Sequence, residues 1–470
     1  MAAEFEFGWL PDLLYRDGHF ANNVAMFADQ QGRITRFSDS PEDLRAASRL
    51  PGRAILPGLV NAHSHSFQRA IRARTEHRTR AVKDTFWTWR DAMYQAAMRL
   101  SPEDIYDVAR MAFLEMLASG ITTVGEFHYL HHQPDGTPYL ERNLLATQVL
   151  GAACETGLRI ALLRTAYARA GWQRESNPGQ ARFITPSPDD FVADTEALRE
   201  FLARTMPGDF AWVGVAPHSL RAVPLPYVLE TVRYARAQNL PIQMHVAEQP
   251  GEIEACEAEY AVRPVALLGR QGILDERFTA VHAIHITEPE IAALAAARAH
   301  ICACGTTERN LGDGIGPAEQ WTSAGVATCF GTDSNVQIDL LEDARQLEYH
   351  LRLKRLERAV LAPDTEPETL AQRLFRCATE TGARSLAAPG GVLAAGRPAD
   401  FFTVDLEDPS LAGADTESLL SHIIFAAGRP AIREVFVGGK AIIQEGRHAL
   451  QPEIVERFAA VQRRVWGPAR

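Results

Sequence analysis

Short apolar runs alternate with longer helical patterns from about residue 54 to residue 390, and this alternation limits the folds that are open to the chain. The apolar runs are continuous, as in strands that are covered on both faces. Eight strands, each followed by a helix, predict a closed (β/α)8 TIM barrel whose active-site residues lie at the C-terminal ends of the strands. The predicted strands are residues 54–62, 121–127, 159–166, 210–216, 241–247, 278–284, 300–305 and 327–332.

The predicted helices begin and end with recognisable signals. Ser101 and Ser187 are each followed by a proline and two acidic residues, a pattern typical of a helix N-terminus. The helix that follows Ser101 carries apolar residues at helical spacing, and we expect it to end by Gly120. These signals support the division of the central region into strand–helix units.

The two ends of the chain have a different pattern. Residues 1–53 and 391–470 contain short β-like runs that are separated by Gly, Asp and Asn. We expect these two segments to form one small β-sandwich domain. The α/β barrel would then comprise residues 54–390.

The composition excludes several classes of protein. Lys and Arg number 48 and Asp and Glu 59, and the resulting net charge of −11 argues against general nucleic-acid binding. No apolar run approaches the roughly 20 residues that span a bilayer, and the N-terminus lacks the pattern of a secretory signal. The six cysteines are scattered, with neither a disulfide framework nor paired zinc-binding spacing. We therefore expect a cytoplasmic protein with reduced thiols that binds neither nucleic acid nor membranes.

Polar side chains occur where several of the predicted strands end. Residues i and i+2 of a strand point to the same face, so the imidazoles of His63 and His65 should converge. Such a pair alone is equally typical of two surface histidines. Further polar residues at the same end of the predicted barrel favour a joint site. The full set is His63 and His65 on strand one, His245 and Glu248 on strand five, His282 on strand six and Asp333 on strand eight.

Three of these histidines and Asp333 are a suitable ligand set for one divalent cation, zinc first or iron, with room for a water molecule. The metal would lower the pKa of that water, Asp333 would accept its proton, and Glu248 would carry protons to the substrate. His282 would lie near the attacking oxygen and stabilise the charge that develops there. The pattern thus predicts hydrolysis at a trigonal carbon. The predicted metal ligands are His63, His65, His245 and Asp333.

This arrangement resembles the amidohydrolase superfamily, whose members carry HxH on strand one, HxxE on strand five, His on strand six and Asp on strand eight. Members with two metals place a bridging lysine at the end of strand four, which here reads "APHS". The pattern is therefore similar to the mononuclear deaminase branch. "GRPADFFTVDL" and "VFVGGKAIIQEGRH" also resemble the terminal β-domain of the superfamily. The resemblance covers nearly the whole chain.

Four further motifs, "HSHSFQRA", "FWTWRDAMY", "EFHYLHHQPDGTPY" and "APHSLRAV", resemble the formimidoylglutamate deiminase family. That family hydrolyses the C=N group of N-formimino-L-glutamate in histidine degradation and releases ammonia and N-formyl-L-glutamate. The resemblance implies this small dianionic substrate and a homodimer. Guanidinium groups suit a dianion because they form paired hydrogen bonds with carboxylates. The substrate-binding positions that the resemblance implies are Gln68, Arg90, Tyr129, His218 and Arg221.

Two alternatives stay open. A deaminase of the same branch that acts on a purine or pterin ring would keep the metal ligands but would need aromatic stacking and amide contacts in place of two arginines. A catalytically inactive scaffold that binds a partner would share the fold, although no ligand or acid–base residue is missing here. The basic segment 69–83 is either a solvated loop or a lid that attracts an anion, and we interpret His128, His131 and His132 as loop residues.

Overall fold

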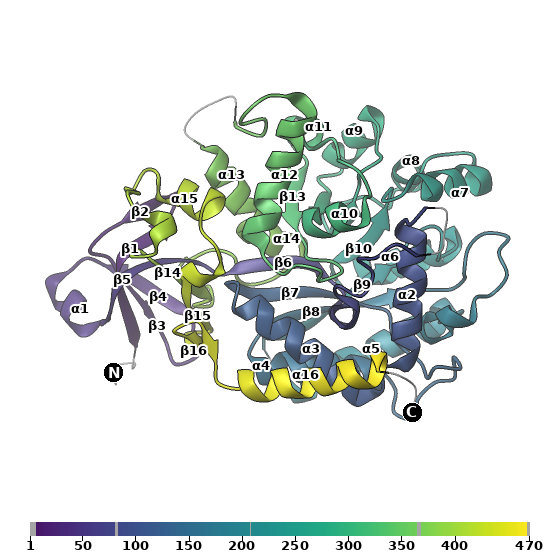
Figure 1. Ribbon diagram of the computed structural model, residues 1–470, viewed down its shortest axis with the longest axis horizontal. Helices are drawn as coiled ribbons and strands as arrows, with labels where there is room; N and C mark the ends of the chain where they lie inside the picture. Colours follow the sequence, from purple (N-terminus) through teal and green to yellow (C-terminus); the bar gives the residue numbers. More distant parts are fainter. Residues whose placement is uncertain (1–5, 80–82, 207, 364–367, 468–470) are drawn as a thin grey trace.

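In the computed structural model, which describes residues 6–79, 83–206, 208–363 and 368–467, eight parallel strands form a nearly closed barrel (Figure 1). Each strand pairs with the next along the chain, and a single bridge between Ser64 and Asp333 joins the first strand to the segment after the last. The predicted α/β barrel is confirmed. Its strands are β6 (Leu59–Ser64), β7 (Ile121–His128), β8 (Arg159–Ala166), β9 (Ala211–Pro217), β10 (Ile242–Val246), β11 (Phe278–His282), β12 (His300–Ala303) and β13 (Ala327–Phe330).

The prediction of one strand over residues 54–62 is wrong, because this run contains parts of two strands in different sheets. The chain leaves β5 (Ser48–Pro57), which belongs to the small sheet, and enters the barrel in β6. Between them the amide of Gly58 donates to the carbonyl of Asp400 (3.0 Å). A Cβ atom at Gly58 would lie 2.2 Å from the side chain of Thr122, so the close approach here requires glycine. Both strands are apolar, and the sequence therefore shows no boundary.

Helices cover the outside of the barrel (Figure 1). The two predicted caps are confirmed, because Ser101 Oγ accepts from the amide of Asp104 and Ser187 Oγ from that of Asp190. The helices are α2 (Phe86–Arg99), α3 (Pro102–Leu117), α4 (Leu144–Thr156), α5 (Pro188–Thr205), α6 (Leu225–Ala237), α7 (Pro250–Tyr260), α8 (Pro264–Arg270), α9 (Glu288–Ala296), α10 (Gly305–Leu311), α11 (Ala318–Ser323), α12 (Leu340–Arg355), α13 (Leu370–Arg376) and α14 (Gly382–Ser385), with the 3-10 helices η1 (Ser66–Ile71) and η2 (Pro178–Phe183) and the π-helical turn η3 (Cys377–Thr381).

Strands from both ends of the chain form a second, mixed sheet beside the barrel, as predicted (Figure 1). The ring of Trp9 packs against Phe401 and Phe436, with ring centroids 5.2 and 5.7 Å apart, so the N-terminal strand shares a core with the C-terminal ones. Hydrogen bonds connect all of these strands in one sheet. Besides β5 the sheet contains β1 (Phe7–Arg16), β2 (His19–Ala21), β3 (Ala25–Ala28), β4 (Ile34–Ser38), β14 (Phe401–Asp405), β15 (Ile432–Val437), β16 (Lys440–Gln444) and β17 (Arg447–His448). Helix α1 (Pro41–Ala46) connects β4 to β5, and α15 (Leu419–Phe425) contacts α12 and α13.

The last helix, α16 (Gln451–Trp466), runs from the small sheet along α3 of the barrel (Figure 1). Arg457 forms an ion pair with Asp107 of α3 (2.8 Å). Trp466 Nε1 donates to the carbonyl of Ala70 (2.9 Å), which lies in η1 directly after the HxH motif. The end of α16 thereby contacts the segment that directly follows the first two predicted ligands.

The basic segment 69–83 is only partly described, because residues 80–82 lie outside the described ranges. Arg69 and Arg72 both form ion pairs with Glu115 of α3 (2.7 and 2.6 Å). These two guanidinium groups thus share one carboxylate of the protein, and the interpretation of the segment as a loop or a lid stays a prediction.

None of the helices in the described part of the chain is long and apolar enough to cross a bilayer.

Candidate active site

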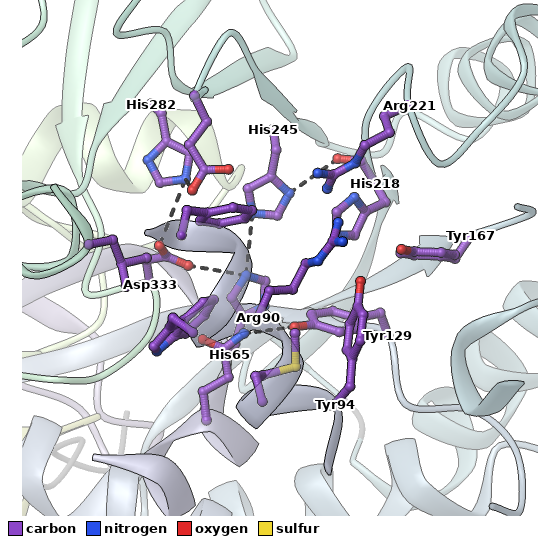
Figure 2. Close-up of a pocket in the computed structure, with 16 residues that line it drawn as sticks. His65, Arg90, Tyr94, Tyr129, Tyr167, His218, Arg221, His245, His282 and Asp333 are labelled. Atoms are coloured by element: carbon purple, nitrogen blue, oxygen red, sulfur yellow. Dashed lines mark hydrogen bonds and ion pairs between the residues drawn. The ribbon is translucent and has the colours of Figure 1, made fainter. Parts of the chain in front are cut away.

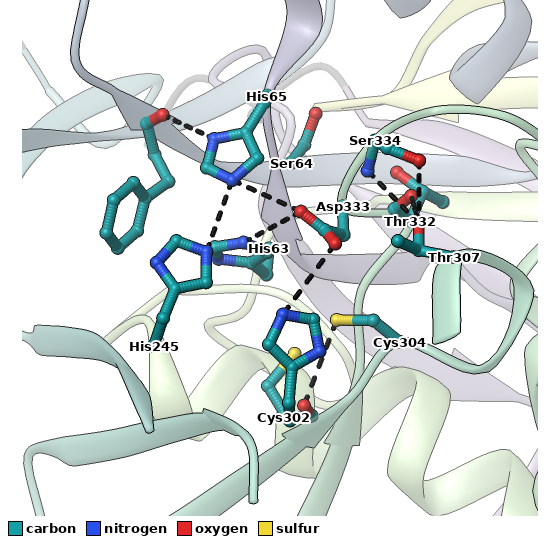
Figure 3. A network of polar contacts seen from close by, with 12 residues as sticks. His63, Ser64, His65, His245, Cys302, Cys304, Thr307, Thr332, Asp333 and Ser334 are labelled. Carbon is teal, nitrogen blue, oxygen red and sulfur yellow. Dashed lines mark hydrogen bonds and ion pairs between the residues drawn. The ribbon is translucent and has the colours of Figure 1, made fainter. Parts of the chain in front are cut away.

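Four of the predicted residues meet at one end of the barrel (Figure 3). Their ligand atoms all lie within 4.8 Å of one another. Asp333 Oδ1 is 3.4 Å from His63 Nε2 and 3.1 Å from His65 Nε2, and the Nε2 atoms of His65 and His245 are 3.3 Å apart. All four side chains are buried. This arrangement brings together the predicted metal ligands His63, His65, His245 and Asp333.

Hydrogen bonds at the outer edge of the cluster orient the three imidazoles. The Nδ1 atoms of His65 and His245 lie 2.9 and 3.1 Å from the carbonyls of Phe127 and His218, so each Nδ1 carries a hydrogen and donates it. His63 Nδ1 lies 3.0 Å from Gln243 Oε1, and Gln243 is oriented because its Nε2 donates to the carbonyl of Ala62. The three Nε2 lone pairs therefore point toward the centre, as metal ligands require.

The protonation states also suit a cation. Burial lowers the pKa of His63 to about 4 and that of His245 well below its usual range, which keeps both imidazoles neutral. Burial would raise the pKa of Asp333, but the imidazoles of His63 and His65 next to its carboxylate outweigh this effect and hold the pKa well below its usual range. His63 Nε2 is buried without a hydrogen-bond partner. Neutral imidazoles and an ionised carboxylate are the forms that bind zinc or iron, and the residues fit such a metal.

Asp333 and His282 have unusual backbone conformations for non-glycine residues, with φ of 45° and 71°. Asp333 lies at the seam of the barrel, where the segment after the last strand meets the first strand. There the amide of Asp333 donates to the carbonyl of His63 (3.0 Å), and its carbonyl accepts from the amide of His65 (2.9 Å). The side-chain amide of Asn335 donates to the carbonyls of His65 and Asp333. The seam is thus closed by the backbone of the residues that form the metal site.

Glu248 and His282 lie beside the four ligands, as the strand-end pattern predicts. Glu248 Oε1 is 3.7 Å from His282 Nε2, which in turn is 3.7 Å from Asp333 Oδ2. Burial raises the pKa of Glu248 to about 7, so this carboxyl can gain and lose a proton near neutral pH. Burial lowers the pKa of His282, but the nearby carboxylates Glu248, Glu308 and Asp333 outweigh this and raise it to about 10.

Glu308 of α10 is a neighbour that sequence reasoning missed. Its Oε1 lies 3.2 Å from His282 Nδ1 and accepts from the amide of Cys304 (2.9 Å). Glu308 therefore holds the His282 ring with Nε2 toward the cluster. Glu308 lies inside a helix, several residues after a predicted strand. A search for polar residues directly at the ends of the predicted strands therefore does not find it.

A pocket opens from the metal ligands and contains every predicted substrate-binding residue (Figure 2). Tyr94 and Tyr167 also line it, and sequence reasoning missed both. Tyr167 directly follows β8, so a search of the strand ends could have found it, and Tyr94 follows Arg90 by one helical turn on α2. The pocket is lined by His65, Gln68, Phe86, Trp89, Arg90, Met93, Tyr94, Tyr129, Tyr167, His218, Arg221, His245, Glu248, His282, Leu311 and Asp333.

Two guanidinium groups face this pocket without a carboxylate partner. The Cζ atoms of Arg90 and Arg221 lie 4.6 and 5.5 Å from the centre of the Trp87 ring, which holds both groups on one aromatic surface. Their Nε atoms are buried without a hydrogen-bond partner. Within the described ranges neither guanidinium forms an ion pair, in contrast to Arg169 close by, which binds Glu259. Two unpaired cations in one pocket provide a site for a ligand with two negative charges.

We call the part of the pocket that contains Arg90 and Arg221 its cationic end. The other predicted substrate-binding residues lie between this end and the metal ligands. Gln68 Nε2 donates to the hydroxyl of Tyr129 (2.7 Å), whose ring lies 5.0 Å from that of His65. Gln68 Oε1 is buried without a partner, which leaves an acceptor for a ligand N–H group. The ring of His218 lies 4.8 Å from that of His245.

Of the histidines interpreted as loop residues, His131 binds the carbonyl of Thr165 through Nε2 (2.8 Å) and lies 5.6 and 6.0 Å, ring to ring, from His128 and His132. Burial lowers the pKa of all three. The prediction that His128 is a loop residue is wrong, because it is the last residue of β7, whereas His131 and His132 lie in the loop that follows.

The sequence matches the model of the amidohydrolase family over residues 54–442. Formimidoylglutamate deiminase of Pseudomonas aeruginosa is 39% identical over 419 residues, which are 88% of this chain and 90% of that protein. A 5-methylthioadenosine/S-adenosylhomocysteine deaminase of Pelotomaculum thermopropionicum is 28% identical over 463 residues, 97% of this chain and 94% of that protein. The crystal structure of an amidohydrolase from Brucella melitensis, 34% identical, superposes with a TM-score of 0.89 and covers 98% of this chain and 99% of its own. The chain therefore belongs to the amidohydrolase family.

Proposed function

We propose that this amidohydrolase is a formimidoylglutamate deiminase, which converts N-formimino-L-glutamate and water into N-formyl-L-glutamate and ammonia. The observation that carries the proposal is the pair of unpaired guanidinium groups, Arg90 and Arg221, in the pocket beside the metal ligands. The substrate carries two carboxylates and no bulky ring, whereas a neutral purine ring has no carboxylate for these two cations to bind. The 39% identical deiminase of Pseudomonas aeruginosa supports the same substrate.

In this proposal the three imidazoles and Asp333 hold one zinc or iron ion. A bound divalent cation supplies a water molecule that loses its proton near neutral pH. The carboxylate of Asp333 is the acceptor for that proton. His282 Nε2, kept toward the centre by Glu308, stabilises the charge that develops as the oxygen adds to the formimino carbon.

Glu248 decides which bond breaks. After water has added, the former formimino carbon carries two nitrogens, and the bond to the protonated nitrogen breaks. Glu248 follows β10 next to the metal ligand His245, with a pKa of about 7, and in this proposal it delivers its proton to the terminal nitrogen. Ammonia then leaves, the carbon becomes a formyl group, and Arg90 and Arg221 keep the rest of the molecule in place through its carboxylates.

The test is to incubate the metal-loaded protein with N-formimino-L-glutamate and to identify the products by NMR. We expect ammonia and N-formyl-L-glutamate. Formamide and glutamate would contradict the order of protonation. Faster turnover of guanine or S-adenosylhomocysteine would contradict the substrate, and the absence of any turnover by the metal-loaded protein would favour the inactive scaffold. We also propose a homodimer, which light scattering on the same sample measures.

A further inference from the structure

Behind the far wall of the pocket lies a glutamine that binds two tyrosine hydroxyls. Gln180 lies in η2 and is 2% exposed. Its side-chain Nε2 donates to the hydroxyl of Tyr94 (2.9 Å) and to that of Tyr167. Both tyrosines line the pocket, whereas Gln180 lies behind them. One amide group therefore fixes the positions of two phenol oxygens that come from different elements, α2 and the end of β8.

The contact with Gln180 determines whether the two hydroxyls can donate hydrogen bonds to a ligand. Each phenol oxygen already accepts a hydrogen from Gln180, so each O–H hydrogen remains for donation. In the described part of the chain neither hydroxyl donates to a carbonyl or a carboxylate, although the two tyrosines also interact with each other. A bond between the two hydroxyls would use one hydrogen only. At least one O–H group is therefore available to a ligand in the pocket.

The tyrosine pair lies at the cationic end of the pocket, away from the metal ligands (Figure 2). The ring of His218 separates Tyr167 from the ligand His245, with ring centroids 4.7 and 4.8 Å apart on its two sides. On the other tyrosine, the Cζ atom of Arg90 lies 5.3 Å from the centre of the Tyr94 ring. A ligand group at this end faces hydrogen-bond donors and positive charge, which suit a carboxylate.

We infer that the pair Tyr94 and Tyr167, oriented by Gln180, donates at least one O–H hydrogen bond to the side-chain carboxylate of the substrate and makes the enzyme selective for dicarboxylic formimino acids. This inference rests on the proposed function. In N-formimino-L-glutamate the side-chain carboxylate is separated from the reacting carbon by more bonds than the α-carboxylate is. With the reacting carbon beside the metal ligands, the side-chain carboxylate is the one that reaches the distal end.

The test compares the double variant Tyr94→Phe/Tyr167→Phe with the wild type on three substrates. These are N-formimino-L-glutamate, N-formimino-L-norvaline, which has a methyl group in place of the side-chain carboxylate, and N-formimino-4-aminobutyrate, which lacks the α-carboxylate. The variant should lower kcat/KM about 10- to 100-fold with the first and third substrates, mainly through KM, because a hydrogen bond to a charged group is lost. It should leave kcat/KM for the norvaline derivative unchanged.

Two further variants make the result specific. Tyr106→Phe removes a hydroxyl that binds Glu155 on the outer helices, and it should not change any of the three values. Gln180→Glu offers only acceptors to the two hydroxyls and should draw their hydrogens away from the ligand, with a loss at least as large as that of the double variant. Metal content, measured in every variant, should stay constant.

The outcomes separate this inference from the proposed function. Wild-type protein that does not turn over N-formimino-L-glutamate overturns both. An active wild type whose double variant is equally active, or loses the same factor on all three substrates, overturns the inference alone. Full activity of Gln180→Glu overturns the assignment of the hydroxyls as donors.

Discussion

The protonation states of the buried side chains differ because each has different neighbours. His63 and His65 each donate a hydrogen bond through Nδ1, and the Nε2 atoms of both lie close to Asp333 Oδ1. The orientation of each ring is therefore fixed on both sides. Among the residues that the structure describes, only His282 lies within ion-pair distance of Glu248, at 3.7 Å, and the Glu248 pKa of about 7 leaves this carboxyl partly protonated near neutral pH. Before the reaction Asp333 is ionised and can accept a proton, whereas Glu248 is the carboxyl that can deliver one to the substrate.

Replacing Glu248 with glutamine tests this role. The substitution keeps the shape but removes the group that titrates, so turnover should fall by about 10²- to 10⁴-fold while the metal stays bound. Ammonia release and metal analysis measure the two effects. The matched control is Glu257→Gln, at an exposed position of helix α7, which begins two residues after Glu248. Wild-type turnover in Glu248→Gln would assign the proton transfer to another residue.

Arg90→Met and Arg221→Met test the binding of the dianion. Each substitution keeps part of the apolar stem but removes one of the two unpaired charges. We expect a loss of about 2–5 kcal/mol in transition-state stabilisation, measured as kcat/KM for N-formimino-L-glutamate. Metal content should not change. Arg233→Met, at an exposed ion pair with Glu230, is the control. If both pocket variants keep the wild-type kcat/KM, the substrate is not held by these groups.

At the scale of elements, the sequence predicted the strands well and the far wall of the pocket poorly. Strand ends converge in any parallel barrel, so residues at those ends could be placed together without coordinates. Gln180 and Tyr94 come from η2 and α2, whose packing against each other depends on tertiary contacts that leave no periodic signal. The boundary at Gly58 was missed for a similar reason, because both sheets bury apolar strands there.

The close packing of β13 against β6 leads to a prediction about the effect of a larger side chain between these two strands. A Cβ atom at Gly331, directly after β13, would lie 2.7 Å from His63 Cβ and 2.9 Å from the His63 carbonyl oxygen. Gly331→Ala should therefore push the two strands apart, destabilise the protein by about 1–3 kcal/mol and weaken metal binding. Denaturant unfolding and metal titration against a competing chelator measure these effects.

Gly269→Ala is the matched control for this substitution. Gly269 lies in helix α8, and its nearest neighbours would be 3.7 Å from an added Cβ, so alanine should be neutral or slightly stabilising. Metal affinity equal to that of the wild type in Gly331→Ala would show that the close contact does not shape the site.

In the whole molecule, the metal site and the closure of the barrel occupy the same place. The strands run in order from β6 to β13, and the ends of this series are joined by the backbone hydrogen bonds between Asp333 and the two histidines of the HxH motif. His245 of β10 completes the site from the opposite part of the barrel wall. A cation at this point would connect three strands directly, and one of the connections crosses the seam.

Removal of the metal should therefore lower the melting temperature of the whole barrel. A cation that binds only the folded state stabilises it by about 4 kcal/mol when its free concentration is 1,000 times Kd. Calorimetry of the protein before and after dialysis against a chelator measures the shift, and added zinc should restore the original value. His63→Ala, which lacks one ligand on β6, should melt at the same temperature with and without zinc. If the wild type loses its metal without a change in melting temperature, the cation does not hold the seam, and the backbone bonds of Asp333 close the barrel alone.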